Sequence, residues 1–195
     1  IWQMDFVELR VGPERRALLL VEDDFSRFCV AHALFEHPTG EDVVSVLEAA
    51  IRLHGKPESV YTDRGGPFLD FDRETSFGAF LERELIDHHL SASYRPQGRG
   101  KVESLAGTVR RELWDVCHFG SVDEAQRALD DFLRGYNHSR AHMGIDGLTP
   151  ADRFFGRQAE VLANMEAVSR RRQGLALFAR SPGDPFVTEE ILPGG

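Results

Sequence analysis

The sequence predicts an α/β protein in which helices flank a mixed β-sheet. Three short runs rich in apolar, β-branched and aromatic residues, at 1–9, 16–22 and 28–34, are separated by turn residues and are typical of a strand meander. Apolar residues at helical spacing follow at 43–51, and a fourth short apolar run occupies 59–61. Because a strand–helix–strand order indicates parallel pairing, the sheet is expected to contain both parallel and antiparallel neighbours.

Turn and capping residues support these assignments. The Gly12-Pro13 pair separates the first two strands, and the polar segment 23–27 separates the second from the third. Thr39, followed three residues later by Asp42, is a helix start signal, and Gly55 ends the apolar helical pattern.

The second half of the chain predicts further helices and one more strand. Apolar spacing predicts a helix over 77–85, and a short segment at 90–94 is the expected fifth strand. An apolar stripe then predicts an amphipathic helix over 101–116, and Ser121 with Glu124 three residues later opens another.

The length and composition indicate a packed globular protein. The 195 residues, 42% hydrophobic and 28% charged, suit one domain plus a short extension. We expect a core domain over 1–157, then a C-terminal segment 158–195 with a helix and a disordered tail beginning at Ser181. Because the chain starts at Ile1 without a signal pattern, we expect it to be a piece of a longer protein.

Apolar runs and cysteines bear on the expected environment. The longest unbroken apolar run, 17–21, is far too short to cross a bilayer, so no membrane association is expected. Cys29 and Cys117 lie far apart without metal-ligand spacing, which favours a reducing, cytoplasmic setting over a disulfide framework or a cysteine zinc site.

Charge is unevenly distributed along the chain. The net charge of −9 argues at first against binding a polyanion. Between residues 91 and 111, however, one acid accompanies a cluster of basic side chains, Arg95, Arg99, Lys101, Arg110 and Arg111. We interpret this basic cluster as a surface for a nucleic-acid backbone, whereas the acidic first half is ordinary solvated surface.

Two aspartates occupy positions that need an explanation. Asp5 lies in a strand whose alternating faces are both largely apolar, and a buried carboxylate must be protonated, paired or bound to a metal ion. Asp63 follows a short strand and precedes a Gly-rich turn, a place where sites commonly form in sheets with helical crossovers. The alternatives are a salt bridge from Asp5 to a nearby arginine and a simple turn-capping role for Asp63.

A glutamate in the helix over 101–116 is a third candidate. On a helical wheel Glu103 lies with Gly107, Arg110 and Trp114 along the border of the apolar stripe. Glu103 can point at the sheet from there, and Gly107 leaves room for a bulky group to approach, while Arg111 faces outward. The alternative is a surface helix with an ordinary Glu–Arg pair.

Together these segments resemble a known family. The motif-bearing segments are 2–6, 61–68, 94–104, 136–144 and 148–150, in this order along the chain. They resemble the integrase core of bacterial insertion-sequence transposases, which is related to retroviral integrases, and the resemblance covers about residues 1–157. It implies an RNase H-like fold, a mixed five-stranded sheet flanked by helices, and a DDE site with Asp5, Asp63 and Glu103 as the three acids.

The resemblance also implies an activity and its cofactors. Members cut element ends and join them to target DNA, using two Mg²⁺ ions that Mn²⁺ can replace. Asp5 would contact both ions, and Asp63 and Glu103 would each hold one. The implied partners are transposon ends and target DNA, bound by a homo-multimer in the bacterial cytoplasm and associated with the nucleoid. For DNA contacts we expect the side chains of Arg99, Lys101, Arg110 and Arg111.

Two features depart from the family pattern. The interval from Asp63 to Glu103 is a few residues longer than is usual, with the excess expected in the region 68–75. Arg64 stands where many relatives have Asn, which puts any secondary role of that neighbour in doubt.

Other readings of the sequence are weaker. The acidic triplet 22–24 is expected to face solvent, because adjacent turn residues project in different directions. His138 and His142 have the spacing of helical zinc ligands but lack a third ligand nearby, and the segment 98–101 lacks the hydroxyl residue of a phosphate loop. Two functional alternatives stay open: a catalytically silent DNA-binding or assembly module, and a purely hydrolytic RNase H-like nuclease, which would leave the segment 136–150 unexplained.

Overall fold

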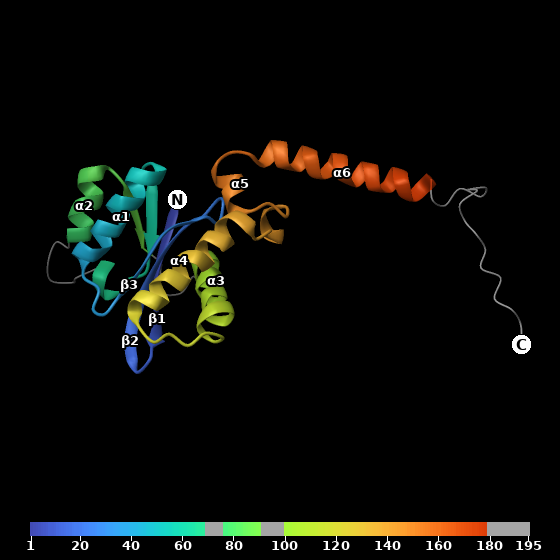
Figure 1. Ribbon diagram of the computed structural model, residues 1–195. Helices are drawn as coiled ribbons and strands as arrows, with labels where there is room; N and C mark the ends of the chain where they lie inside the picture. The colour runs from blue at the N-terminus through green and yellow to red at the C-terminus, as the bar shows by residue number, and fades with distance from the viewer. Residues whose placement is uncertain (69–75, 91–99, 179–195) are drawn as a thin grey trace, which may run out of the picture. The chain divides into compact units, whose positions relative to one another are not determined.

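The computed structural model describes residues 1–68, 76–90 and 100–178, with side chains through residue 172 (Figure 1). Within these residues five strands form one sheet in the order β3-β2-β1-β4-β5. The strands are β1 (Trp2–Val11), β2 (Glu14–Asp23), β3 (Cys29–Phe35), β4 (Ser59–Thr62) and β5 (Asp87–Leu90). The helices are α1 (Gly40–His54), α2 (Ser76–Glu84), α3 (Gly100–Val109), α4 (Val122–Ser139), α5 (Pro150–Phe154) and α6 (Gln158–Phe178), with short helices η1 (Gly66–Phe68) and η4 (Met143–Ile145) and the π-helix η3 (Arg110–Trp114).

The sheet is mixed, which confirms the predicted fold class. β1 pairs antiparallel with β2 along its whole length, and β2 pairs antiparallel with β3. On its other side β1 pairs parallel with β4, and β4 pairs parallel with β5. α1 lies between β3 and β4 along the chain, so it is the crossover that parallel pairing requires.

The fifth strand of the described residues, β5, covers 87–90; of the expected segment 90–94, the last four residues lie outside the described part of the chain. The first three residues of β5 are polar and the strand is mostly exposed, so no apolar alternation marks it. It is held by backbone pairing with β4, from Ser59 opposite Asp87 to Thr62 opposite Leu90.

Alternation along β1 divides the sheet into two faces. Trp2 and Met4 belong to an apolar cluster with α1 and α2, and Leu9 belongs to a second cluster with α3, η3 and α4. Figure 1 shows α1 and α2 on one side of the sheet and α3 and α4 on the other. Because every second side chain shares a face, the odd-numbered residues of β1, including Gln3 and Asp5, project toward α3 and α4.

Caps fix where the two long helices of the core begin. Thr39 and Asp42 form a reciprocal capping box at α1, as predicted, and Ser121 accepts a hydrogen bond from the backbone N–H of Glu124 at α4. α1 ends at Gly55, whose φ of 86° lies in the region that glycine adopts without steric cost.

The chain divides into two compact units, Ile1–Gly156 and Arg157–Gly195. The second contains α6, where a helix is predicted, and most of its side chains through Arg172 are exposed. The expected disordered tail, from Ser181, lies outside the described residues. None of the described helices combines the length and the apolar character needed to cross a bilayer.

Glu22 contradicts the prediction that the acidic triplet faces solvent. It is fully buried at the end of β2, on the face covered by α4, and it accepts a hydrogen bond from the Tyr136 hydroxyl at 3.4 Å. Its Oε2 has no hydrogen-bond partner in the described part of the chain. Burial raises the pKa of Glu22 to about 8, although Arg27 and Lys101 act in the opposite direction. The prediction failed because β2 continues through Asp23, so that Glu22 lies within the strand and the turn begins only at Asp24.

Glu22 should make folding stability depend on pH. Its folded-state pKa is raised, so between about pH 4.5 and 8 the folded state binds more protons than the unfolded state, and stability falls as pH rises. Glu22→Gln should remove this dependence and be more stable than wild type at pH 8.5 by a few kcal/mol, at about 1.4 kcal/mol per pKa unit. Urea unfolding between pH 5 and 8.5 measures the difference, with Glu82→Gln on the exposed face of α2 as control. Parallel pH profiles for wild type and Glu22→Gln would contradict the buried protonated state.

Candidate active site

Asp5 lies in the middle strand of the sheet, on the face that α3 covers. Its exposed fraction is 8%, in a strand whose apolar neighbours pack on both faces. The predicted burial is therefore confirmed. A carboxylate in such a place is stable only with charged or polar partners, and its neighbour on the same face, Gln3, is also buried.

Asp63 follows the last residue of β4. In the parallel pairing of β1 with β4, Trp2 lies opposite Val60 and Gln3 lies opposite Tyr61. Asp5 lies two residues beyond the paired segment of β1, and Asp63 lies two residues beyond the paired segment of β4. The two predicted acids therefore follow the same stretch of parallel pairing on adjacent strands.

A tight turn orients Asp63. Its Oδ1 accepts a hydrogen bond from the backbone N–H of Gly65 at 2.8 Å, the Asx turn that the alternative reading anticipated. A Cβ added to Gly65 would lie 2.8 Å from the same oxygen, so only glycine leaves room for this contact. The turn holds the carboxylate near the end of β4, and the two roles of Asp63 are therefore compatible.

Glu103 lies in the first turn of α3 and is exposed. Its neighbour Val102 is buried, and the backbone N–H of Val102 donates to Gln3 Oε1 at 3.3 Å. This contact brings the first turn of α3 to within two residues of Asp5 along β1. The three carboxylates do not form a complete metal site here. The described residues contain no group of three or more His, Cys, Asp or Glu side chains arranged to hold a metal ion.

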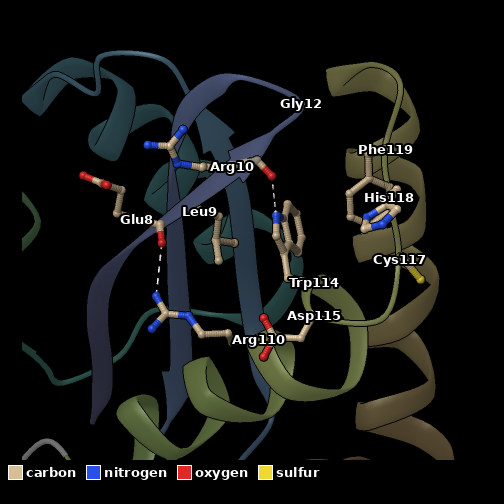
Figure 2. Close-up of a pocket in the computed structure, with 10 residues that line it drawn as sticks. All are labelled: Glu8, Leu9, Arg10, Gly12, Arg110, Trp114, Asp115, Cys117, His118 and Phe119. Atoms are coloured by element: carbon tan, nitrogen blue, oxygen red, sulfur yellow. Dashed lines mark hydrogen bonds between the residues drawn. The ribbon is translucent and has the colours of Figure 1, made fainter.

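The far end of the helix is attached to the open edge of β1. Pairing with β4 covers only Trp2 and Gln3, and later carbonyls of β1 accept side-chain donors instead. Arg110 donates to the Glu8 carbonyl at 3.1 Å, and Trp114 Nε1 donates to the Arg10 carbonyl at 2.8 Å, as the dashed lines in Figure 2 show. These bonds satisfy polar groups that an unpaired strand edge leaves exposed.

A groove of about 520 Å³ lies beside these contacts (Figure 2). Its walls are the end of β1, η3 and the segment that follows η3, and the Trp114 ring packs against Phe119 with ring centroids 5.0 Å apart. Glu8 and Asp115 line it together with Arg110, so its charge is mixed. The π-helical turn is where Arg110 and Trp114 both reach the strand.

The four residues predicted to contact DNA have different surroundings. Arg99 lies outside the described residues. Lys101 Nζ forms an ion pair with Asp24 Oδ2 at 2.6 Å and also donates to the Asp24 carbonyl at 3.2 Å. Arg110 and Arg111 are exposed, although Arg110 also holds β1.

Gly107 does not leave the open space that the sequence predicts. A Cβ added at this position would lie 2.9 Å from Arg111 Nη1, so the Arg111 side chain lies back over the glycine. The helical-wheel argument missed this contact because residues four apart are neighbours on a helix, and a long side chain can cover the residue one turn before it.

The two histidines that were weighed as zinc ligands pack against aromatic rings. His138 lies edge-on to Phe28 with ring centroids 5.9 Å apart, and His142 lies edge-on to Tyr136 at 4.7 Å. Burial lowers the pKa of His142, with Arg140 and Arg27 acting in the same direction.

Comparison with known proteins identifies the family of this chain. The family described as integrase core domain matches residues 1–96 in one form and 84–150 in another. The chain is 32% identical over 151 residues to the uncharacterized 39.2 kDa protein of insertion element IS476 from Xanthomonas euvesicatoria, covering 77% of this chain and 42% of that protein. It is 24% identical over 153 residues to the putative transposase InsK of insertion sequence element IS150 from Escherichia coli K12, covering 77% and 53%.

The chain belongs to the integrase core family. A solved structure of the HTLV-2 integrase catalytic core domain in complex with magnesium, in a dimeric form, matches it with a TM-score of 0.58 and 23% identity, covering 76% of this chain and 91% of that one. That likeness shows that this integrase core has the RNase H-like fold. The chain spans about half the length of the two insertion-element relatives, or less.

The donor chemistry of this integrase core suits a hard divalent cation. The three acids supply only carboxylate oxygens, the ligands that Mg²⁺ prefers. Asp5 is buried, and a bound cation would offset part of the cost of burying its charge.

Sequence reasoning missed the residues that hold α3 in place. Gln3 was given no role, Asp24 was expected to face solvent with the rest of the acidic triplet, and Trp114 was noted only for its place on the wheel. One signal was available for Gln3, because an amide side chain inside an otherwise apolar strand requires hydrogen-bond partners.

Gly107→Ala should stabilise the integrase core. The added Cβ meets only the end of a flexible side chain, and alanine is favoured over glycine inside a helix by about 0.5–1 kcal/mol. Thermal unfolding measures the change. The matched control is Gly55→Ala, which should destabilise because its φ is 86°. A destabilising Gly107→Ala would show that the helix surface there is more tightly packed than the Arg111 contact implies.

Proposed function

We propose that this chain is the catalytic core of a DDE transposase that cuts the ends of a DNA element and joins them to target DNA. The observation that supports the proposal is the parallel pairing of β1 with β4, because Asp5 follows the paired residues of β1 by two positions and Asp63 directly follows β4. The relatives named for insertion elements support the transposase type over other uses of the fold.

Each acid has a part in this proposal. Asp5 would contact both of two Mg²⁺ ions, and Asp63 and Glu103 would each hold one, with Mn²⁺ able to replace Mg²⁺. The chemistry that bound divalent ions supply is activation of the attacking oxygen and stabilisation of the leaving 3′ oxygen. β1 gives Asp5 a rigid base, the Gly65 turn orients Asp63, and the attached first turn of α3 carries Glu103.

The partners and the extent of the core also belong to the proposal. We propose DNA ends and target DNA as substrates and a homo-multimer as the working form, supported by the dimeric form of the similar HTLV-2 core. The bacterial relatives support action in the cytoplasm, at the nucleoid when DNA is bound. Residues 1–157 would form the catalytic core and 158–195 an extension, supported by the division after Gly156.

The isosteric variants Asp5→Asn, Asp63→Asn and Glu103→Gln test the acidic triad. Each keeps the shape of the side chain and removes a charge. In wild type, Mn²⁺ at about 100 times its dissociation constant should stabilise the fold by roughly 2.7 kcal/mol, and each variant should lose most of that gain. Each should also abolish Mn²⁺-dependent nicking of supercoiled plasmid and joining of an oligonucleotide 3′ end to duplex DNA.

Two exposed carboxylates provide controls for the triad. Glu82→Gln on α2 and Asp131→Asn on α4 should retain full activity and the full stabilisation by Mn²⁺. Near-normal joining by Glu103→Gln would refute the triad. If the wild-type protein nicks plasmid DNA but does not join ends, the result would favour the hydrolytic nuclease. If the wild-type protein binds DNA but carries out neither reaction, the result would favour the silent module.

Arg110→Ala with Arg111→Ala tests the DNA path. If both residues contact phosphates, the slope of log affinity against log salt should flatten by about 1–2 units, since each contact contributes roughly 0.9. Arg111→Ala alone, which leaves the Arg110–Glu8 bond intact, should give about half of the effect. Fluorescence anisotropy with a labelled duplex measures the slope. Arg127→Ala with Arg134→Ala, exposed on α4, is the control, and an unchanged slope in the first pair would remove both residues from the DNA path.

A further inference from the structure

We propose that Gln3, Asp24 and Lys101 are positioning residues that set where Glu103 lies relative to Asp5. This inference rests on the proposed function, because it assigns these three residues to the support of the proposed acidic site. They come from β1, the turn between β2 and β3, and the first turn of α3. Their hydrogen bonds join the three elements in one continuous network.

Gln3 is the centre of the network. It is 3% exposed, and both ends of its side-chain amide are used: Nε2 donates to Asp24 Oδ1 at 2.5 Å, and Oε1 accepts from the backbone N–H of Val102 at 3.3 Å. The first N–H groups of a helix have no partner inside the helix. Gln3 therefore supplies from β1 the acceptor that a capping residue would otherwise provide.

Asp24 and Lys101 close the network on the other side. Lys101 Nζ is 2.6 Å from Asp24 Oδ2 and 3.2 Å from the Asp24 carbonyl oxygen. The Asp24 backbone N–H donates to the Ile1 carbonyl at 2.9 Å, so the turn is itself attached to the start of β1. Both oxygens of one carboxylate are thus engaged, one by β1 and one by α3.

The geometry connects this network directly to the proposed acids. Gln3 and Asp5 are two apart on one strand, so their side chains share a face, and Lys101 and Val102 immediately precede Glu103. Two consecutive residues before Glu103 are therefore held, one through its ammonium group and one through its backbone N–H. The backbone that carries Glu103 is therefore attached to β1 through Gln3 and to the turn after β2 through Lys101.

This role changes the reading of Lys101. The sequence assigned it to the DNA surface, but its ammonium group is engaged with Asp24, and its side chain is 38% exposed. Groups behind the ligands of a metal site orient them, and their loss typically costs about 10–100-fold in metal affinity or activity. Lys101 and Gln3 are expected to act in this way through Glu103.

The first measurement needs neither metal nor activity. Gln3→Met keeps the length of the side chain and removes the acceptor for the Val102 N–H. Amide hydrogen exchange at Val102 should therefore accelerate at least about tenfold, while amides in the middle of α4 keep their wild-type rates. Unchanged exchange at Val102 would refute the cap.

The second measurement is the Mn²⁺ concentration for half-maximal plasmid nicking, together with Mn²⁺-induced thermal stabilisation. Gln3→Met and Lys101→Met should each raise the Mn²⁺ concentration needed for half-maximal nicking, and that needed for half-maximal stabilisation, by about tenfold or more. The affinity of each variant for DNA should stay near that of wild type. Lys101→Arg, which can still pair with Asp24, should recover most of the loss. Lys56→Met is the matched control, because Lys56 also binds a carbonyl, that of Glu84, and lies away from the site.

The outcomes separate this inference from the proposed function. If Glu103→Gln remains active, the acidic triad itself is wrong. If Glu103→Gln is inactive while Lys101→Met and Gln3→Met keep the wild-type Mn²⁺ dependence, the positioning role is wrong and the triad stands. Weakened DNA binding by Lys101→Met with an unchanged Mn²⁺ dependence would return Lys101 to the DNA surface and overturn its role here.

Discussion

The attachment of α3 to β1 is the contact on which the candidate site depends. Two of the three acids belong to the sheet and its strand ends, where backbone pairing determines their positions, but the third belongs to a helix. A helix packed only through apolar side chains has several shallow minima against a sheet. Directional bonds at both ends, from Gln3 to Val102 and from Arg110 and Trp114 to β1, select one of them.

The same face of the sheet has an apolar region and a polar region. Leu9, Leu18 and Leu20 pack under α3 and α4, whereas Gln3, Asp5 and Glu22 lie buried toward one end of β1 and β2. Buried polar groups cost stability unless they are paired, and Glu22 retains an oxygen with no partner among the described residues. The polar region thus lowers the stability of the fold, and it contains Asp5 of the proposed site.

Two basic residues of the cluster that suggests DNA binding also bond to other segments of the protein. Lys101 pairs with Asp24 in the turn after β2, and Arg110 donates to a carbonyl of β1. A cation at a partly exposed position can hold a protein carbonyl and still contribute to the field felt by a phosphate. Arg111 is exposed, and the end of its side chain lies over Gly107.

The sequence by itself determined the mixed sheet, the starts of α1 and α4 and the burial of Asp5, because these follow from local periodicity, capping residues and the cost of burying charge. It also pointed to Asp63 and Glu103 through separated motifs. Only the tertiary structure decided that β5 lies at 87–90, that Glu22 is buried and that Lys101 pairs with Asp24. These features depend on pairing between segments far apart in the chain, and neither a polar edge strand nor an ion pair across 77 residues leaves a periodic signal in the sequence.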